Sequence, residues 1–246
     1  MPTYICTNIN YMLGLKLATD PRWANIAEGN LEEILSDHAW CEQKAATNAI
    51  TIVTLNSELD DLVTDMLALA KEELTHFEQV HAIILKRGYT FGRERPDDYV
   101  KELYKFMRKG GTRNDQLIER LLFAAMIEAR SCERFKVLSE NIKDEELATF
   151  YRELMISEAG HYTLFLNYAR KYTERIDVNQ RWKEWLEGEA EVIARYGKSS
   201  GVHGSKNSVR PSADGRTPFK LTKLKTKPFL FSCLLQSLVI FLCRYF

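Results

Sequence analysis

Apolar residues recur at helical spacing along four long stretches of this chain, about residues 26–54, 58–87, 115–140 and 144–171. Within each stretch, hydrophobic positions lie three and four residues apart, which places them on one face of an α-helix. Ser57 and Asn114 are candidate N-caps for the second and third helices, and Gly88 is a candidate stop for the second. Residues 1–25 lack this periodicity and predict an irregular lead-in.

The lengths of the connections predict how these helices are arranged. The first and second helices are joined by a few residues, as are the third and fourth, so each pair should form an antiparallel hairpin. The connection 88–114 is long and contains a short amphipathic stretch, 97–108. Two hairpins joined by one long crossover predict an all-α, ferritin-like four-helix bundle. An additional C-terminal helix over 178–196 is expected to pack outside it.

The composition is that of a globular protein, with 45% hydrophobic and 28% charged residues. The formal net charge of zero conceals an asymmetry between two parts of the chain. Residues 205–246 carry eight Lys and Arg against one Asp, a charge of +7, so residues 1–204 carry −7. A chain of this kind has no global basic field, and any RNA must be bound by a local patch.

This shift in character predicts a folded domain over 1–204 and a basic tail over 205–246. Residues 197–227 are polar and basic, a composition that predicts disorder. Phe229–Cys243 is almost wholly apolar, but as a helix it spans roughly 22 Å against a bilayer core of about 30 Å. The tail is therefore not expected to cross a membrane, although an interfacial anchor is compatible with it.

Cysteine usage bears on the cellular compartment. The five cysteines are an odd number without CxxC spacing, which predicts neither a disulfide framework nor a thiolate zinc site. The N-terminus has no charged region followed by an apolar run, so no signal peptide is expected. Together these features predict a cytoplasmic protein.

Two Glu-x-x-His motifs lie on alternate predicted helices, Glu73 with His76 on the second and Glu158 with His161 on the fourth. A spacing of three residues puts the carboxylate and the imidazole on one helical face, within reach of one metal ion. A single such motif is common by chance, and surface charge beside a core histidine explains most single cases. Two copies on alternate helices indicate a metal site much more strongly.

A metal pair in such a bundle also needs one bridging glutamate from each remaining helix. On the first helix, Glu42 lies at the centre of the apolar stripe, where a charge requires a partner or a metal ion. On the third helix, Glu128 lies centrally on the apolar face, whereas Glu133 lies about 140° away. Glu42 and Glu73 are 31 residues apart and Glu128 and Glu158 are 30 apart, a pseudo-repeat that also favours Glu128.

Four carboxylates and two imidazoles suit iron or manganese better than zinc or copper. The pattern assigns catalysis to the metal pair itself, without a separate acid or base. The six predicted metal ligands are Glu42, Glu73, His76, Glu128, Glu158 and His161.

Three further residues are candidates for supporting the ligands. His38 lies one turn before Glu42 on the same stripe, where it either contacts a ligand or is a satisfied core histidine. Arg130 and Glu133 form either a network around the site or an ordinary cluster of ion pairs. The sequence leaves these alternatives open.

Four segments of the chain resemble the MiaE-type tRNA hydroxylases: His38–Ala46, Lys71–Phe77, Ile127–Phe135 and Ser157–Tyr162. The resemblance covers about residues 12–204, and the tail departs from the family pattern. It implies a non-haem di-iron monooxygenase that hydroxylates the isopentenyl group of 2-methylthio-isopentenyl-adenosine beside the tRNA anticodon. Two iron ions, O2 as co-substrate, tRNA and an electron donor are implied with it. By position, the family's iron ligands fall on the same six residues.

Two other functions are compatible with the pattern. A ferroxidase or rubrerythrin-like peroxidase would use the same six ligands without tRNA, and a non-enzymatic, tail-anchored bundle would use none. For a tRNA substrate, phosphate contacts are expected from basic residues of the crossover, with a solvated loop as the alternative. These residues are Arg93, Arg95, Lys105, Arg108, Lys109 and Arg113. Phe77, Phe135 and Phe165 are candidates for lining a prenyl pocket or for filling the core.

Overall fold

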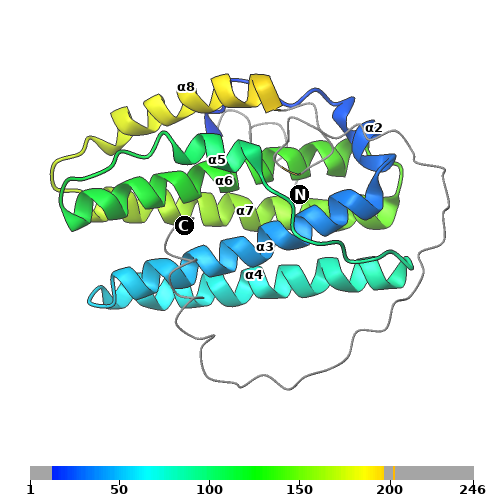
Figure 1. Ribbon diagram of the computed structural model, residues 1–246, viewed down its shortest axis with the longest axis horizontal. Helices are drawn as coiled ribbons and strands as arrows, with labels where there is room; N and C mark the ends of the chain where they lie inside the picture. Colours follow the sequence, from blue (N-terminus) through cyan, green and yellow to red (C-terminus); the bar gives the residue numbers. More distant parts are fainter. Residues whose placement is uncertain (1–12, 197–201, 203–246) are drawn as a thin grey trace, which may run out of the picture. The chain divides into compact units, whose positions relative to one another are not determined.

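The computed structural model describes residues 13–196 and residue 202, and over that part of the chain it contains helices and no strands (Figure 1). Contacts divide the chain into Met1–Ser208 and Val209–Phe246, and every described residue belongs to the first unit. The predictions for residues 1–12 and for the tail over 205–246 therefore lie outside the described residues. Within the described part, no helix is both long and apolar enough to span a bilayer.

Four long helices make up the bundle: α3 (Leu31–Leu55), α4 (Asp60–Lys86), α6 (Arg113–Asn141) and α7 (Glu145–Tyr172). Helix α3 packs along α4, and α6 packs along α7, as two antiparallel hairpins (Figure 1). The crossover between the hairpins contains α5 (Asp98–Tyr104), and α8 (Val178–Tyr196) packs on α5 and α6. The predicted ferritin-like bundle with an additional C-terminal helix is confirmed.

The start of the first long helix differs from the prediction of one helix beginning near residue 26. A short helix, α2 (Trp23–Glu28), ends at Gly29, and α3 begins after Asn30. Asn30 leaves the helical conformation with φ −138°, and its side-chain amide donates to the Ile26 carbonyl. Asparagine favours such local hydrogen bonds over helix continuation, so the chain turns a corner here.

The predicted N-caps Ser57 and Asn114 are both wrong. Helix α4 begins after Leu59, which makes no side-chain capping bond. Helix α6 begins after Thr112, whose hydroxyl accepts from the Asp115 N–H while the Asp115 carboxylate accepts from the Thr112 N–H. This capping box satisfies two unpaired donors at once, an advantage that Asn114 lacks.

A polar layer interrupts the apolar core halfway along the bundle. On one side of this layer lies a cluster that includes Met66 of α4 and Phe165 of α7. On the other side lies a cluster that includes Leu35 of α3 and Val80 of α4. The buried carboxylates and imidazoles of the four long helices fall between them.

Candidate metal centre

All six predicted ligands are buried in this polar layer, and each exposes at most 7% of its surface. They come from all four long helices. Their ligand atoms form two groups, and within each group the atoms lie within 4.8 Å of one another. One group is Glu42, Glu73, His76 and Glu158, and the other is Glu73, Glu128, Glu158 and His161.

Glu73 and Glu158 belong to both groups, whereas Glu42 and Glu128 belong to one each. The helical pattern predicts the bridging position for Glu42 and Glu128, whereas the geometry places the glutamates of the two Glu-x-x-His motifs in both ligand groups. Each half of the pseudo-repeat thus offers one carboxylate common to both groups, one carboxylate of a single group and one imidazole.

The ligand atoms face a common space without satisfying one another. His161 Nδ1 lies 3.0 Å from Glu73 Oε1, and His76 Nδ1 lies 3.5 Å from Glu73 Oε2. Both Nδ1 atoms, both Glu73 oxygens and Glu158 Oε1 are buried and lack a well-aligned hydrogen bond among the described residues. An unsatisfied buried polar group costs about 1–3 kcal/mol. A convergent set of this kind, made of carboxylates and imidazoles, fits a pair of divalent iron or manganese ions.

Protons stabilise the carboxylates when no metal ion is bound. Burial raises the pKa of Glu73 to about 7. Burial, reinforced by the neighbouring Glu128, raises the pKa of Glu158 well above its ordinary value. Burial therefore favours the protonated form of both groups in the metal-free site, and a bound cation would replace the proton.

The two imidazoles are shifted toward the charged form. Burial opposes the charge, but the carboxylates of Glu42 and Glu73 raise the pKa of His76 to about 10. In the same way Glu73 outweighs burial and raises the pKa of His161 to about 9. Metal binding requires neutral imidazoles, so loading this site must release protons.

Glu72 faces both imidazoles from the outer side of the site, and the periodicity argument does not select it. Its carboxylate oxygens lie 3.4 Å from His161 Nε2 and 4.0 Å from His76 Nε2, and Ser157 donates a hydrogen bond to it. A carboxylate in this position orients a metal-binding imidazole and leaves Nδ1 for the metal. The four-residue spacing from Glu72 to His76 on one helix is a sequence signal for the contact with His76.

His38 contacts a predicted ligand directly. Its Nε2 lies 2.6 Å from Glu42 Oε1, and its ring stacks on Tyr151 with centroids 5.5 Å apart. Against the effect of burial, His38 helps to hold the pKa of Glu42 below its usual range. His38 is therefore placed to keep Glu42 ionised and oriented.

Arg130 and Glu133 have their partners on the other side of α6. Arg130 donates to Glu133 at 2.9 Å and to Glu189 of α8 at 2.8 Å. Glu133 accepts from both the backbone N–H and the hydroxyl of Thr19. These hydrogen bonds and ion pairs connect α6 to α8 and to the segment before α2. Arg130 and Glu133 therefore stabilise the packing of these elements.

A four-helix bundle with two Glu-x-x-His motifs and two further buried glutamates defines a ferritin-like protein of the carboxylate metal-pair class. Residues 7–204 match the family described as tRNA-(MS[2]IO[6]A)-hydroxylase (MiaE). The chain belongs to that family.

Two relatives share the name tRNA 2-(methylsulfanyl)-N(6)-isopentenyladenosine(37) hydroxylase. The protein of Pseudomonas putida (strain KT2440) is 37% identical over 160 residues, which are 65% of this chain and 77% of the relative. The protein of Salmonella typhimurium (strain LT2) is 38% identical over 132 residues, which are 54% of this chain and 47% of the relative. The match thus spans about half of the second relative's length.

Solved structures with the same fold include a protein from Synechococcus with aldehyde deformylating oxygenase activity, which is 30% identical to this chain with a TM-score of 0.71. The similarity covers 77% of this chain and 95% of the Synechococcus chain. The bundle is therefore shared with an oxygenase.

Proposed function

We propose that this chain is an oxygen-dependent di-iron hydroxylase acting on the isopentenyl group of 2-methylthio-isopentenyl-adenosine beside the tRNA anticodon. The observation that carries the proposal is the convergence of four glutamates and two histidines in one buried layer of a MiaE-family chain. The names of the two relatives support this substrate class.

The reaction sets requirements for the partners. Inserting one oxygen atom of O2 into a C–H bond consumes two electrons and two protons and releases one water molecule. A reduced electron-donor protein is therefore part of the proposal. A pair of iron ions supplies the oxygen chemistry that protein side chains cannot perform.

The chain's own residues hold and orient that pair. Glu73 and Glu158 would supply shared carboxylates, since both belong to the two ligand groups. His76 and His161 would bind through Nδ1, because Glu72 faces their Nε2 atoms. Glu158 would hold a proton in the metal-free site and release it on loading.

The surroundings of the site suit an apolar substrate group. Apolar clusters lie on both sides of the polar layer and limit the access of water. Phe135 packs against His38 with ring centroids 4.8 Å apart, next to the site, whereas Phe77 stacks on His81. Phe165 packs in the cluster that contains Met66. Of the three predicted phenylalanines, Phe135 is therefore the candidate for contact with the prenyl chain.

The nucleoside profile of tRNA tests the proposal. A strain that lacks the gene should lose the hydroxylated nucleoside and accumulate its isopentenyl precursor, and the wild-type gene should restore it. Liquid chromatography with mass spectrometry measures both nucleosides. An unchanged profile together with altered peroxide sensitivity would instead support a ferroxidase or peroxidase, which the names of the relatives do not favour. A cytoplasmic location is proposed with the tRNA substrate.

A further inference from the structure

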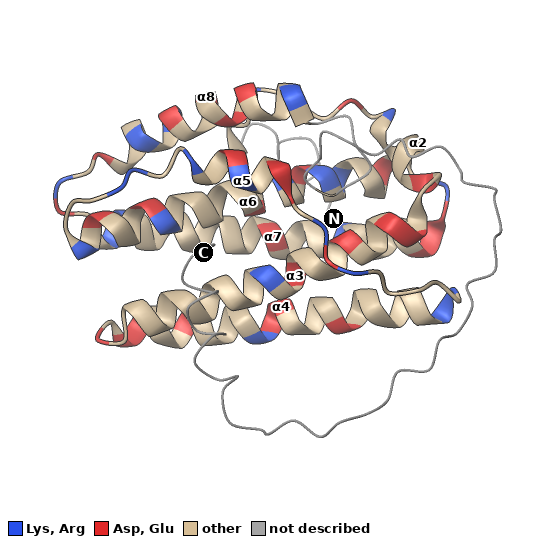
Figure 2. Ribbon diagram, viewed as in Figure 1, with Lys and Arg blue, Asp and Glu red and all other residues tan. Residues whose placement is uncertain are grey.

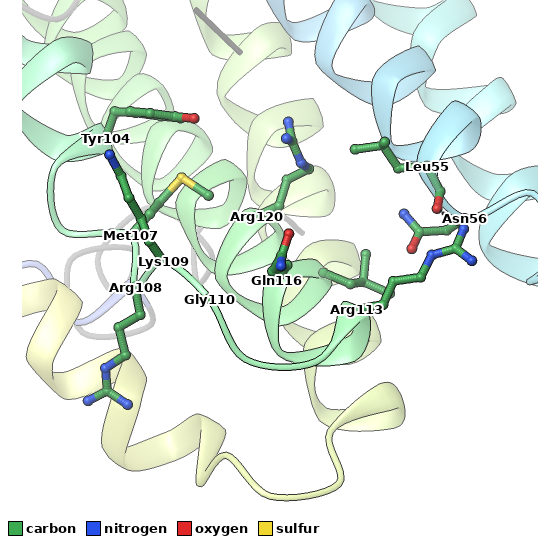
Figure 3. A pocket seen from close by; sticks show the side chains of 11 residues that line it. Leu55, Asn56, Tyr104, Met107, Arg108, Lys109, Gly110, Arg113, Gln116 and Arg120 are labelled. Atoms are coloured by element: carbon green, nitrogen blue, oxygen red, sulfur yellow. Dashed lines mark hydrogen bonds between the residues drawn. The ribbon is translucent and has the colours of Figure 1, made fainter. Parts of the chain in front are cut away.

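A cavity of about 280 Å³ with a basic lining lies where α6 begins, away from the metal layer. It is bounded by the C-terminal end of α3, the segment that joins α5 to α6, and the first two turns of α6 (Figure 3). Figure 2 shows Lys and Arg positions along this segment and at the start of α6. The polar lining residues are Asn56, Tyr104, Arg108, Lys109, Arg113, Gln116 and Arg120, and no described lining residue is acidic.

Arg120 is the residue that makes this cavity unusual. It is half-buried, and among the described residues no carboxylate lies within ion-pairing distance of it. Burial lowers the pKa of Arg120, and the nearby Tyr104 opposes this shift only in part. By contrast, the buried Arg130 and Arg181 are each paired with glutamates. A desolvated guanidinium without an anion costs free energy, so the geometry favours an anion that comes from outside the chain.

The other cations of the cavity differ in whether they have a carboxylate partner. Arg108 pairs with Glu184 of α8, and Arg113 binds Glu58 and the Leu55 carbonyl. Lys109 has no carboxylate partner among the described residues. Figure 3 shows the Arg120 guanidinium among the lining side chains and Arg108 directed away from them.

The turn beside Lys109 depends on two glycines. Gly110 and Gly111 have φ values of 84° and 82°, a left-handed conformation that glycine adopts without steric cost. They reverse the chain between Lys109 and Arg113, so both residues line the same cavity. The site is therefore built by backbone geometry as well as by charge.

We propose that this cavity binds a phosphate group of the RNA substrate, with Arg120 and Lys109 as its charged donors and Tyr104 and Gln116 as neutral donors. The inference rests on the proposed function. Guanidinium groups bind phosphate oxygens through paired, charge-assisted hydrogen bonds. None of the contacts predicted from the sequence included Arg120, because it lies inside a helix and not in the crossover.

The distance to the metal layer is suitable for a loop nucleotide. Arg120 precedes Glu128 by eight residues on α6, which is roughly 12 Å at about 1.5 Å per residue. Proteins that recognise RNA loops splay bases out of the stack and hold the neighbouring backbone. A phosphate in the cavity would thus be held while an adjacent base is directed toward the metal layer.

RNA binding by the full-length chain tests this site. The variant is Arg120→Met, and the matched control is Arg152→Met, which removes the same charge from an exposed position on α7. Fluorescence anisotropy would measure the affinity for an anticodon stem-loop without the prenyl group, over a range of KCl concentrations. Arg120→Met should raise Kd about tenfold and lower the slope of log K against log salt by about one. Arg152→Met should leave both unchanged.

Metal content and thermal stability separate this effect from misfolding. Both variants should retain wild-type iron content, and Arg120→Met should keep its Tm because no acidic partner is lost. If Arg120→Met misfolds, Lys109→Ala at an exposed position replaces it, and an unchanged affinity there would overturn the site.

Two results of the RNA titration would contradict the inference: wild-type affinity in Arg120→Met, or equal weakening in both arginine variants. Either result would refute the assignment of the cavity to an RNA phosphate, whereas tRNA hydroxylation by the wild-type chain would still support the proposed function. Inorganic phosphate, titrated by calorimetry, is the second arm. Loss of phosphate binding in Arg120→Met with unchanged RNA affinity would show a site for a free anion and refute the RNA assignment. A wild-type chain that neither binds the stem-loop nor hydroxylates tRNA would remove the proposed function itself.

Discussion

Replacing Glu158 by glutamine should leave the metal-free protein nearly unchanged and strongly reduce its stabilisation by iron. Glu158 exposes 2% of its surface, and its Oε1 lies 4.0 Å from Nδ1 of both His76 and His161. Burial and Glu128 raise its pKa well above its ordinary value, which favours the neutral carboxylic acid in the metal-free site. Glutamine has nearly the same shape as this neutral form, so Glu158→Gln is expected to disturb the metal-free site little.

The loaded protein should respond differently. Glu158 belongs to both ligand groups, and its loss weakens both metal positions. A ligand present at 100 times its Kd stabilises the folded state by about 2.7 kcal/mol. For a domain of this size, about 1 kcal/mol shifts Tm by roughly 2–4 °C. Iron should therefore raise the Tm of the wild-type chain by about 5–11 °C and the Tm of Glu158→Gln by much less.

Differential scanning calorimetry under anaerobic conditions, with and without ferrous iron, measures both effects, and elemental analysis gives the iron content. Exposed Glu153 on the same helix provides the control, since Glu153→Gln should respond to iron as the wild-type chain does. Equal stabilisation of Glu158→Gln and wild type by iron would refute the proposed ligand role. A large loss of Tm in the metal-free variant would show a structural role instead.

Three further predictions concern the surroundings of the site. Because carboxylates raise the pKa of His76 to about 10 and of His161 to about 9, metal loading at pH 7 should release about two protons from the imidazoles. The affinity for the metal should therefore fall as the pH is lowered. Calorimetry in two buffers of different ionisation enthalpy measures the proton release, and its absence would contradict this prediction. Glu72→Gln should weaken metal binding by about 10–100-fold, whereas Glu78→Gln at an exposed position should leave it unchanged. If an iron titration gives the same Kd for both variants, Glu72 does not orient the imidazoles. Arg130→Met should lower the free energy of unfolding by about 3–5 kcal/mol, because it removes the guanidinium that pairs with the buried Glu133 and Glu189. Urea unfolding measures this change, and a loss below about 1 kcal/mol would show that the ion pairs of Arg130 are dispensable.

The four-helix bundle and the convergence of the six side chains could be predicted from the sequence, because both depend on helical periodicity. A charge at the centre of an apolar stripe, such as Glu42 or Glu128, is predictable from angles about one helix axis. The same angles separate Glu128 from Glu133, and in the structure Glu133 accepts from Thr19 instead of joining the ligand groups.

Contacts between different helices and loops could not be predicted from helical periodicity. Glu72 reaches His161 across the gap between α4 and α7, and no spacing in the chain encodes that approach. The sequence around Arg120 does not distinguish it from an ordinary solvated arginine on a helix. Its place in the cavity becomes apparent only when the structure brings the crossover beside it. The division of α2 from α3 and the capping box at Thr112 depend on local hydrogen bonds that compete closely with the alternatives.

Anomalous diffraction at the iron absorption edge, from crystals of the iron-loaded full-length chain, tests the central claim most directly. Two anomalous peaks should lie in the polar layer, one beside Glu42 and His76 and the other beside Glu128 and His161, with Glu73 and Glu158 between them. A single peak, or Glu42 or Glu128 turned away from the imidazoles, would contradict the account.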